Sequence, residues 1–128
     1  MGLGTEHFTE RELACPCCGI NRMVTPFMAK VEAMRSVFGK PLTVSRAYSC
    51  SKHNMEVSKT GPNGPHTTGH AIDIVISGED DYALLDIALT IGFNGIGINQ
   101  KGPMDKRFLH FDDLQNSPTV PRPRIWSY

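Results

Sequence analysis

Apolar residues recur at spacings of three and four between positions 24 and 38, a pattern that predicts an amphipathic helix. Thr25 and Pro26 are placed as an N-cap and a first helical turn, and Gly39 follows the last apolar position. We interpret the methionines of this stripe as core filler rather than as a ligand surface. The members of the stripe are Val24, Phe27, Met28, Val31, Met34 and Phe38.

Two further helices are predicted from shorter patterns. Residues 8–13 contain Thr9 followed three positions later by Glu12, which is a capping-box pattern for a short helix. Residues 82–91 follow an acidic turn at 78–81, where negative charge favours the start of a helix. The residues of this later helix that we expect to face the core are Leu85, Ala88 and Leu89.

Four strands are predicted, at residues 41–49, 70–76, 93–99 and 108–112. In the second strand isoleucines occupy one face and Asp73 the other. Residues 51–64 are polar and predict a loop, with one helical turn near residues 53–57. The tail from Asn116 is rich in proline, and we expect it to be irregular, with Trp126 folded back over the core.

The order of these elements predicts an α+β fold, in which helices pack on a small, mainly antiparallel sheet. A length of 128 residues fits one domain, so we expect residues 1–128 to form a single domain. Lys plus Arg and Asp plus Glu are balanced at 13 each, which gives a formal net charge of zero. A neutral chain lacks the electrostatic footprint of a nucleic-acid-binding protein.

The chain contains no long apolar run, and we therefore expect no membrane partner. Its first ten residues show neither the positive nor the apolar region of a signal peptide. We expect the chain to be cytoplasmic as synthesised, and monomeric.

The chain has four cysteines, of which Cys15, Cys17 and Cys18 lie together and Cys50 lies apart. This clustering argues against a disulfide framework spread over a small secreted fold. The favoured interpretation is reduced or locally paired thiols that tie down the N-terminal segment. A structural zinc knuckle made by the cluster and Cys50 is an alternative, although Cys-x-Cys-Cys is not the usual two-residue spacing of zinc ligands. Nothing marks one cysteine as an activated catalytic thiol.

The segment 65–73 contains the most informative chemistry. It places His66 in a loop and Asp73 on the following strand, and His110 lies on a separate predicted strand. Two histidines and one carboxylate form a donor set that suits Zn²⁺, and three protein ligands leave the fourth tetrahedral position open, as in catalytic zinc sites. Asp112 lies on the same face of its strand as His110, where it can reach water in the site or orient a ligand.

These residues resemble the pattern Ser-x-His-x-x-Gly-x-Ala-x-Asp, followed by a later His, of the zinc D-Ala-D-Ala carboxypeptidases and L-Ala-D-Glu endolysins. These murein peptidases share a fold with lysostaphin-type enzymes and Hedgehog signalling domains, and the chain most closely resembles their compact phage-type members. The resemblance extends to residues 51–54, to the opening segment 7–13 and to the closing Trp126, so it covers nearly the whole chain. The matching positions of the pattern are His66, Gly69, Ala71, Asp73 and His110.

The chain also departs from the family pattern. Gly64 stands where the family has Ser, and Arg46 lies three residues before the usual place of the family's arginine. The acid or second histidine that often precedes the last ligand by two or three residues is absent, and Phe108 and Arg107 occupy those positions. Gly69 is expected to permit a close backbone approach or a positive φ.

The resemblance implies zinc-dependent hydrolysis of an amide bond in peptidoglycan stem peptides, as a D-Ala-D-Ala carboxypeptidase or as a murein endopeptidase of the endolysin type. Such an enzyme would act on the cell wall after release or phage delivery. The implied zinc ligands are His66, Asp73 and His110.

For catalysis, Asp112 is the first candidate for the general base, ahead of Asp105 and Asp113. Arg46 or Arg107 is expected to hold the oxyanion or a substrate carboxylate. The alternative function is a non-catalytic module of the same fold, which contains zinc and serves binding or phage structure. The remaining histidines are interpreted as surface or supporting residues; they are His7, His53 and His70.

Overall fold

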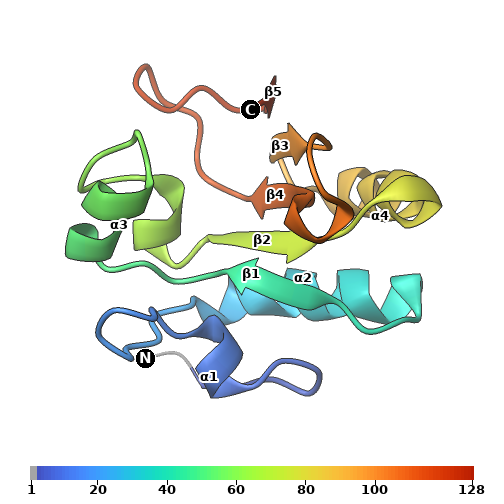
Figure 1. Ribbon diagram of the computed structural model, residues 1–128, viewed down its shortest axis with the longest axis horizontal. Coiled ribbons are helices and arrows are strands. Elements are labelled where there is room, and N and C mark those ends of the chain that lie inside the picture. The colour runs from blue at the N-terminus through green and yellow to red at the C-terminus, as the bar shows by residue number, and fades with distance from the viewer. Residues whose placement is uncertain (1–2) are drawn as a thin grey trace.

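The computed structural model describes residues 3–128 as an α+β fold built around a five-stranded sheet (Figure 1). Met1 and Gly2, which belong to the segment searched for a signal peptide, lie outside the described residues. The strands are β1 (Thr43–Arg46), β2 (Ala71–Val75), β3 (Gly95–Asn99), β4 (Phe108–Asp112) and β5 (Arg124–Ser127). The helices are α1 (Glu10–Leu13), α2 (Thr25–Phe38), α3 (Ser51–Val57) and α4 (Gly78–Ile91), with 3₁₀ turns η1 (Pro65–Thr68) and η2 (Met104–Lys106). None of the helices in this part of the chain is long and apolar enough to span a membrane.

The sheet has the strand order β1-β2-β4-β3-β5, so that β4 lies at its centre. β4 pairs antiparallel with both β2 and β3, and β1 pairs antiparallel with β2, whereas β5 runs parallel to β3. In this register Asp73 lies directly opposite His110, and Gly97 lies opposite the same histidine from the other side. The mainly antiparallel sheet predicted from the sequence is therefore confirmed.

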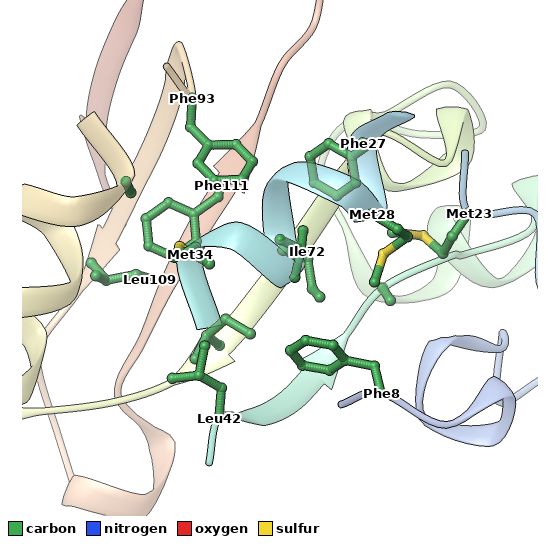
Figure 2. Close-up of a cluster of buried hydrophobic side chains, with 14 of the residues drawn as sticks. Phe8, Met23, Phe27, Met28, Met34, Leu42, Ile72, Phe93, Leu109 and Phe111 are labelled. Atoms are coloured by element: carbon green, nitrogen blue, oxygen red, sulfur yellow. The ribbon is translucent and has the colours of Figure 1, made fainter. Parts of the chain in front are cut away.

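The apolar face of the sheet packs against the helices. In Figure 2, Phe27, Met28 and Met34 of α2 gather with Ile72 of β2 and with residues of β4 in one cluster. α2 also packs against α4, which lies beside it (Figure 1). The strand residues that alternate with the site-facing positions, and that are buried in this cluster, are Ile72, Ile74, Ile96, Leu109 and Phe111. Burial of a side chain of this size stabilises the fold by roughly 1.5–3 kcal/mol.

The predicted helices form with small differences at their ends. The capping box of α1 is present, because Thr9 accepts from the backbone of Glu12 and the Glu12 side chain accepts from the backbone of Thr9. α2 begins at Thr25 itself, so its N-cap is Val24, which makes no side-chain cap. The helix predicted at residues 82–91 is present as α4, but the prediction was wrong about where it begins and about Leu89. The acidic turn is the first turn of this helix, and Leu84 rather than the exposed Leu89 is buried.

The predicted strands are present, and β4 has the predicted bounds. The expected irregular tail is the main error, since residues Arg124–Ser127 form β5 and pair with β3. Trp126 lies against His110, with 5.1 Å between the ring centroids, and not over the apolar core. The predicted loop after residue 50 begins with a full helix, α3, instead of a single turn.

Gly69 connects η1 to β2 in a backbone conformation that favours glycine. Its φ is +78°, and a Cβ at this position would lie 2.1 Å from the carbonyl oxygen of Arg22. Its own carbonyl accepts from the N–H of Val24 at 3.0 Å. Both the close approach and the positive φ expected from the sequence are present.

We expect Gly69→Ala to lower the free energy of unfolding by more than the roughly 1–2 kcal/mol that a left-handed alanine costs, because the new methyl group also meets the Arg22 carbonyl. Gly39→Ala is the matched control, since Gly39 has φ +79° with nothing within 4 Å of the added Cβ. Urea unfolding of both variants measures the difference. Equal losses would show that the backbone near Arg22 yields without cost.

Candidate metal centre

Three potential metal ligands converge on the polar face of the sheet. His66 comes from η1, Asp73 from β2 and His110 from β4, and one ligand atom of each lies within 4.8 Å of the others. His66 Nε2 is 3.2 Å from Asp73 Oδ1, and His110 Nδ1 is 2.9 Å from the same oxygen. All three side chains are buried.

This donor set fits a tetrahedral zinc ion. Ligand atoms about 2.0–2.1 Å from such an ion lie about 3.3 Å from one another, by tetrahedral geometry. The separations between Asp73 Oδ1 and the two histidine nitrogens are close to this value. The two imidazole rings are nearly perpendicular, at 81°, so their nitrogens approach Asp73 from different directions.

A backbone carbonyl fixes the orientation of His66. Its Nδ1 lies 2.8 Å from the carbonyl oxygen of Ala47, just after β1. A proton on Nδ1 satisfies this acceptor and leaves the lone pair of Nε2 directed at Asp73. The backbone of the same segment is tied to η1 a second time, since the N–H of Ser49 donates to the His66 carbonyl at 3.1 Å.

A carboxylate and a guanidinium fix the orientation of His110. Its Nε2 lies 2.7 Å from Asp112 Oδ2. Both oxygens of Asp112 accept from Arg122, from Nε at 2.8 Å and from Nη2 at 2.8 Å. The side chain of Asp112 is fully buried, and a carboxylate behind a ligating imidazole sets which nitrogen faces the metal. Nδ1 of His110 is the nitrogen left to face Asp73.

These contacts set the charge state of the cluster. Burial raises the pKa of Asp73, but the charges and hydrogen bonds of His66 and His110 outweigh it and hold that pKa well below its usual range. Asp112 is likewise held ionised, because His110 and Arg122 lower its pKa against the effect of burial. Burial lowers the pKa of His110, whereas Asp112 and Asp73 raise it more. The carboxylates are therefore anionic at neutral pH, as metal ligation and its support require.

Two glycines of β3 provide space on this face of the sheet. A Cβ on Gly95 would lie 2.0 Å from Asp112 Oδ1, and a Cβ on Gly97 would lie 2.8 Å from Trp126 Nε1. The Asp112 carboxylate and the indole of Trp126 occupy the volume that side chains would otherwise fill. Glycine at these strand positions thus allows groups of the site to approach the backbone closely.

The ligand cluster opens into a cavity of about 720 Å³. Among the described residues four cationic side chains line it, and one of them, Arg122, is paired with Asp112. The other three are Arg46, Lys59 and Arg124. Arg46 donates only to the neutral groups of Ser49 and Asn54. Burial lowers the pKa of Arg46 and the negative charge of Asp73 opposes that shift, but an arginine remains protonated in either case. The guanidinium therefore keeps its charge available to the cavity.

One wall of the cavity comes from the C-terminal segment of the chain. Trp126 and Tyr128 line it together with Arg122. Arg122 and Arg124 both lie near the ring of Trp126, at 5.2 and 5.5 Å from its centroid. Among the described residues that line the cavity, Asp73 is the only one with an acidic side chain.

The predicted catalytic residues divide into two groups. Arg46 faces the cavity, whereas Asp112 lies behind His110 with both oxygens engaged and does not line it. This placement favours the second of the two roles considered for Asp112, which was to orient a ligand. Asp113 accepts from Lys30 and lies 2.8 Å from His70 Nδ1, away from the cavity.

The two remaining candidates are also outside the cavity. Asp105 lies on the exposed turn η2, and Arg107 donates to the carbonyl oxygen of Gly102.

The departure from the family pattern at Gly64 has a local cause, because a Cβ there would lie 2.1 Å from the Thr60 hydroxyl oxygen. In this chain Thr60 fills space beside Gly64.

Sequence reasoning missed the contributions of the chain after residue 112. Arg122 has no partner recognisable from spacing, since it pairs with Asp112 ten residues earlier. The sequence predicted Trp126 over the core, because nothing around a single tryptophan in a proline-rich tail indicates which surface it packs against. The two glycines of β3 were the available clue, since Gly95 and Gly97 share a strand face and leave room for larger groups.

Three of the four cysteines gather away from this cavity. Sγ atoms of Cys15, Cys18 and Cys50 lie within 4.8 Å of one another. Burial by itself raises the pKa of Cys15, but backbone N–H groups of Cys50, Cys18 and Cys17 outweigh it and lower the pKa to about 7. All four thiols are free of disulfide bonds.

The family comparison agrees with this architecture. Residues 6–112 match the family model described as Peptidase M15. No curated protein matches the chain. The matched range spans α1 to β4 and includes the two histidines and the aspartate of the cluster. Peptidases of this family are metal-dependent and act on peptides, and the chain belongs to the peptidase M15 family.

Proposed function

We propose that this protein is a zinc-dependent peptidase that hydrolyses an amide bond in peptidoglycan stem peptides. The observation that carries the proposal is the group of His66, Asp73 and His110 at a cavity with cationic walls, in a chain of the peptidase M15 family. The cluster contains three ligands, the number typical of catalytic zinc.

In this proposal the three residues hold the metal through His66 Nε2, Asp73 Oδ1 and His110 Nδ1. Zinc, when bound, supplies Lewis acidity that polarises a carbonyl and lowers the pKa of water. The carbonyl of Ala47 keeps His66 in the tautomer that ligates, and the pair of Asp112 and Arg122 does the same for His110. Their packing leaves each ligand little freedom to turn away.

The cavity chemistry supports an anionic peptide as substrate. Stem peptides carry carboxylates, and Arg46, Lys59 and Arg124 present positive charge to the cavity. The negative charge of Asp73 raises the pKa of Arg46, so this guanidinium interacts electrostatically with one of the proposed metal ligands. We propose that its guanidinium holds the substrate carboxylate or the oxyanion that develops during hydrolysis.

A second function, a zinc-containing binding module, is favoured by one specific observation. Asp73 is the only acidic side chain among the described residues of the cavity, and in the proposed site it serves as a ligand. A base that takes a proton from water is then absent from the cavity walls described here, which suits recognition without turnover. Hydrolysis of purified murein separates the two functions.

The first test uses purified murein and His66→Ala. We expect the unaltered protein to release new amino groups and shortened stem peptides while leaving the glycan strands intact, and His66→Ala to lose this activity. The variant should also lose one equivalent of zinc per chain, measured by elemental analysis. His53→Ala is the control, because His53 lies on α3 and does not line the cavity.

Zinc binding without any cleavage of murein would favour the binding module. Release of reducing sugars without new amino groups would mean a glycosidase and would defeat the peptidase proposal. Unchanged zinc content in His66→Ala would remove this residue from the ligand set.

The second test examines Asp112. If it orients His110, Asp112→Asn should weaken zinc binding by about 10–100-fold. It should also destabilise the fold by roughly 3–5 kcal/mol, because Arg122 would be left buried without its partner. The double variant Asp112→Asn with Arg122→Gln should regain part of this stability and none of the zinc affinity. Titration with zinc measures the effect on metal binding, and urea unfolding measures the effect on stability.

Full zinc affinity together with a 10²–10⁴-fold loss of turnover would instead assign Asp112 as the general base.

The third test examines Arg46. A hydrogen bond to a charged group contributes about 1.5–3 kcal/mol, so Arg46→Ala should lower kcat/KM by roughly 10–100-fold with zinc content unchanged. Arg107→Ala is the matched control, since Arg107 donates to the Gly102 carbonyl outside the cavity. Equal kcat/KM in Arg46→Ala and the unaltered protein would exclude a role for this guanidinium.

A further inference from the structure

The cysteines of two distant segments meet on the side of the molecule where α1 contacts β1 and α3 begins. Cys15 follows α1, and Cys50 is the N-cap of α3. Their Sγ atoms lie 3.7 Å apart, far longer than the roughly 2.05 Å of a disulfide bond. Thiolates at about 2.3 Å from a tetrahedral zinc ion lie about 3.8 Å apart, by the geometry of the tetrahedron. The observed separation is thus close to that of two thiolate ligands of one zinc ion.

The third member of the group has the spacing of a zinc knuckle. Cys18 lies within 4.8 Å of both other thiols, and it is separated from Cys15 by two residues, Pro16 and Cys17. The objection raised from the sequence, that Cys-x-Cys-Cys lacks the usual spacing, is therefore wrong about the pair that converges. Two residues between ligands is the spacing common to structural zinc sites.

The backbone around these sulfurs is arranged to favour thiolates. The N–H of Cys50 points at Cys15 Sγ at 3.4 Å, and the N–H of His53 points at Cys50 Sγ at 3.4 Å. The turn that carries the cluster is closed by two hydrogen bonds, from Cys15 N–H to Ile20 and from Gly19 N–H to Cys15. The thiolate is the form that binds metal, and donors aimed at sulfur stabilise it.

We propose a second, structural zinc site formed by Cys15, Cys18 and Cys50, with Cys17 as its fourth ligand. The Sγ atoms of Cys15, Cys18 and Cys50 are the ones that converge, and Cys17 is the remaining cysteine of the same turn, next to Cys18 in the chain. Four thiolates make a closed tetrahedral site, the form typical of structural zinc. This site is separate from the cavity of the proposed peptidase.

The position of this site suggests what it does. It joins the turn after α1 to the first turn of α3, and a short segment of chain leads from the end of β1 to α3. That segment begins with Ala47, which follows Arg46 of β1 and whose carbonyl holds His66. A metal here would anchor the N-terminal segment to the part of the chain that supports a ligand of the first site.

The experiment uses His66→Ala as the background, so that the metal at the proposed peptidase site does not contribute. The protein is purified under reducing conditions without chelator, and zinc is then replaced by Co²⁺. We expect one equivalent of metal and an intense sulfur-to-cobalt charge-transfer band in the near ultraviolet, which a histidine and carboxylate site cannot give. Mass spectrometry after iodoacetamide should show four protected thiols, all of which react once a chelator is added.

Cys50→Ser in the same background should lose the metal and the charge-transfer band. Ser51→Ala is the matched control, because it alters one side-chain atom at the next residue of α3 and should retain both. Circular dichroism identifies any variant that fails to fold, and the alkylation pattern of the folded background protein tests the proposal without a cysteine substitution.

Four thiols that react with iodoacetamide before chelation would overturn the site. A mass lower by two hydrogens, restored by reductant, would mean a disulfide in its place. Protection of three thiols with Cys17 alkylated would overturn the assignment of the fourth ligand.

Discussion

A continuous line of buried polar groups organises this molecule. It runs from Arg122 through Asp112 and His110 to Asp73 and His66, with each group within hydrogen-bonding distance of the next. An isolated charge in such a position would be strongly unfavourable, so the groups are stable only together. The line crosses β4 and β2, and it ends at η1 on one side and at the segment before β5 on the other. The fold must therefore bring a 3₁₀ turn, two central strands and the C-terminal tail into one place.

The sequence predicted well those parts of the structure that depend on local periodicity. The stripe of α2 and the bounds of β4 follow from spacing alone, because both elements bury one regular set of positions. The same reasoning placed His110 and Asp112 on one face of a strand, and their side chains do meet. It also identified His66 and Asp73 from the pattern between them, and their side chains lie together.

The parts that the sequence did not predict depend on pairing between distant segments. β5 is short, follows a proline-rich stretch and has an exposed Ile125, so its local pattern carries little signal, and only its alignment beside β3 makes it a strand. The partner of Asp112 was missed for the same reason. The convergence of Cys15, Cys18 and Cys50 also required the fold, because nothing near Cys50 indicates that it approaches the N-terminal turn.

The site combines residues from the part of the chain that matches the family with residues that follow position 112. The match to the peptidase M15 family ends at that residue, and the three candidate ligands lie within it. Arg122, Trp126 and Tyr128 lie beyond the match, yet they support Asp112 and form walls of the cavity. The glycines of β3 lie within the match and leave room for Asp112, Trp126 and Tyr128, so the two parts fit at the sheet surface. Because the ligands lie on η1, β2 and β4 while these walls come from the C-terminal segment, the walls can vary with less effect on the ligands. Substitutions at Trp126 or Tyr128 would therefore alter which peptide enters the cavity, whereas substitutions at Arg122 would act on the cluster through Asp112.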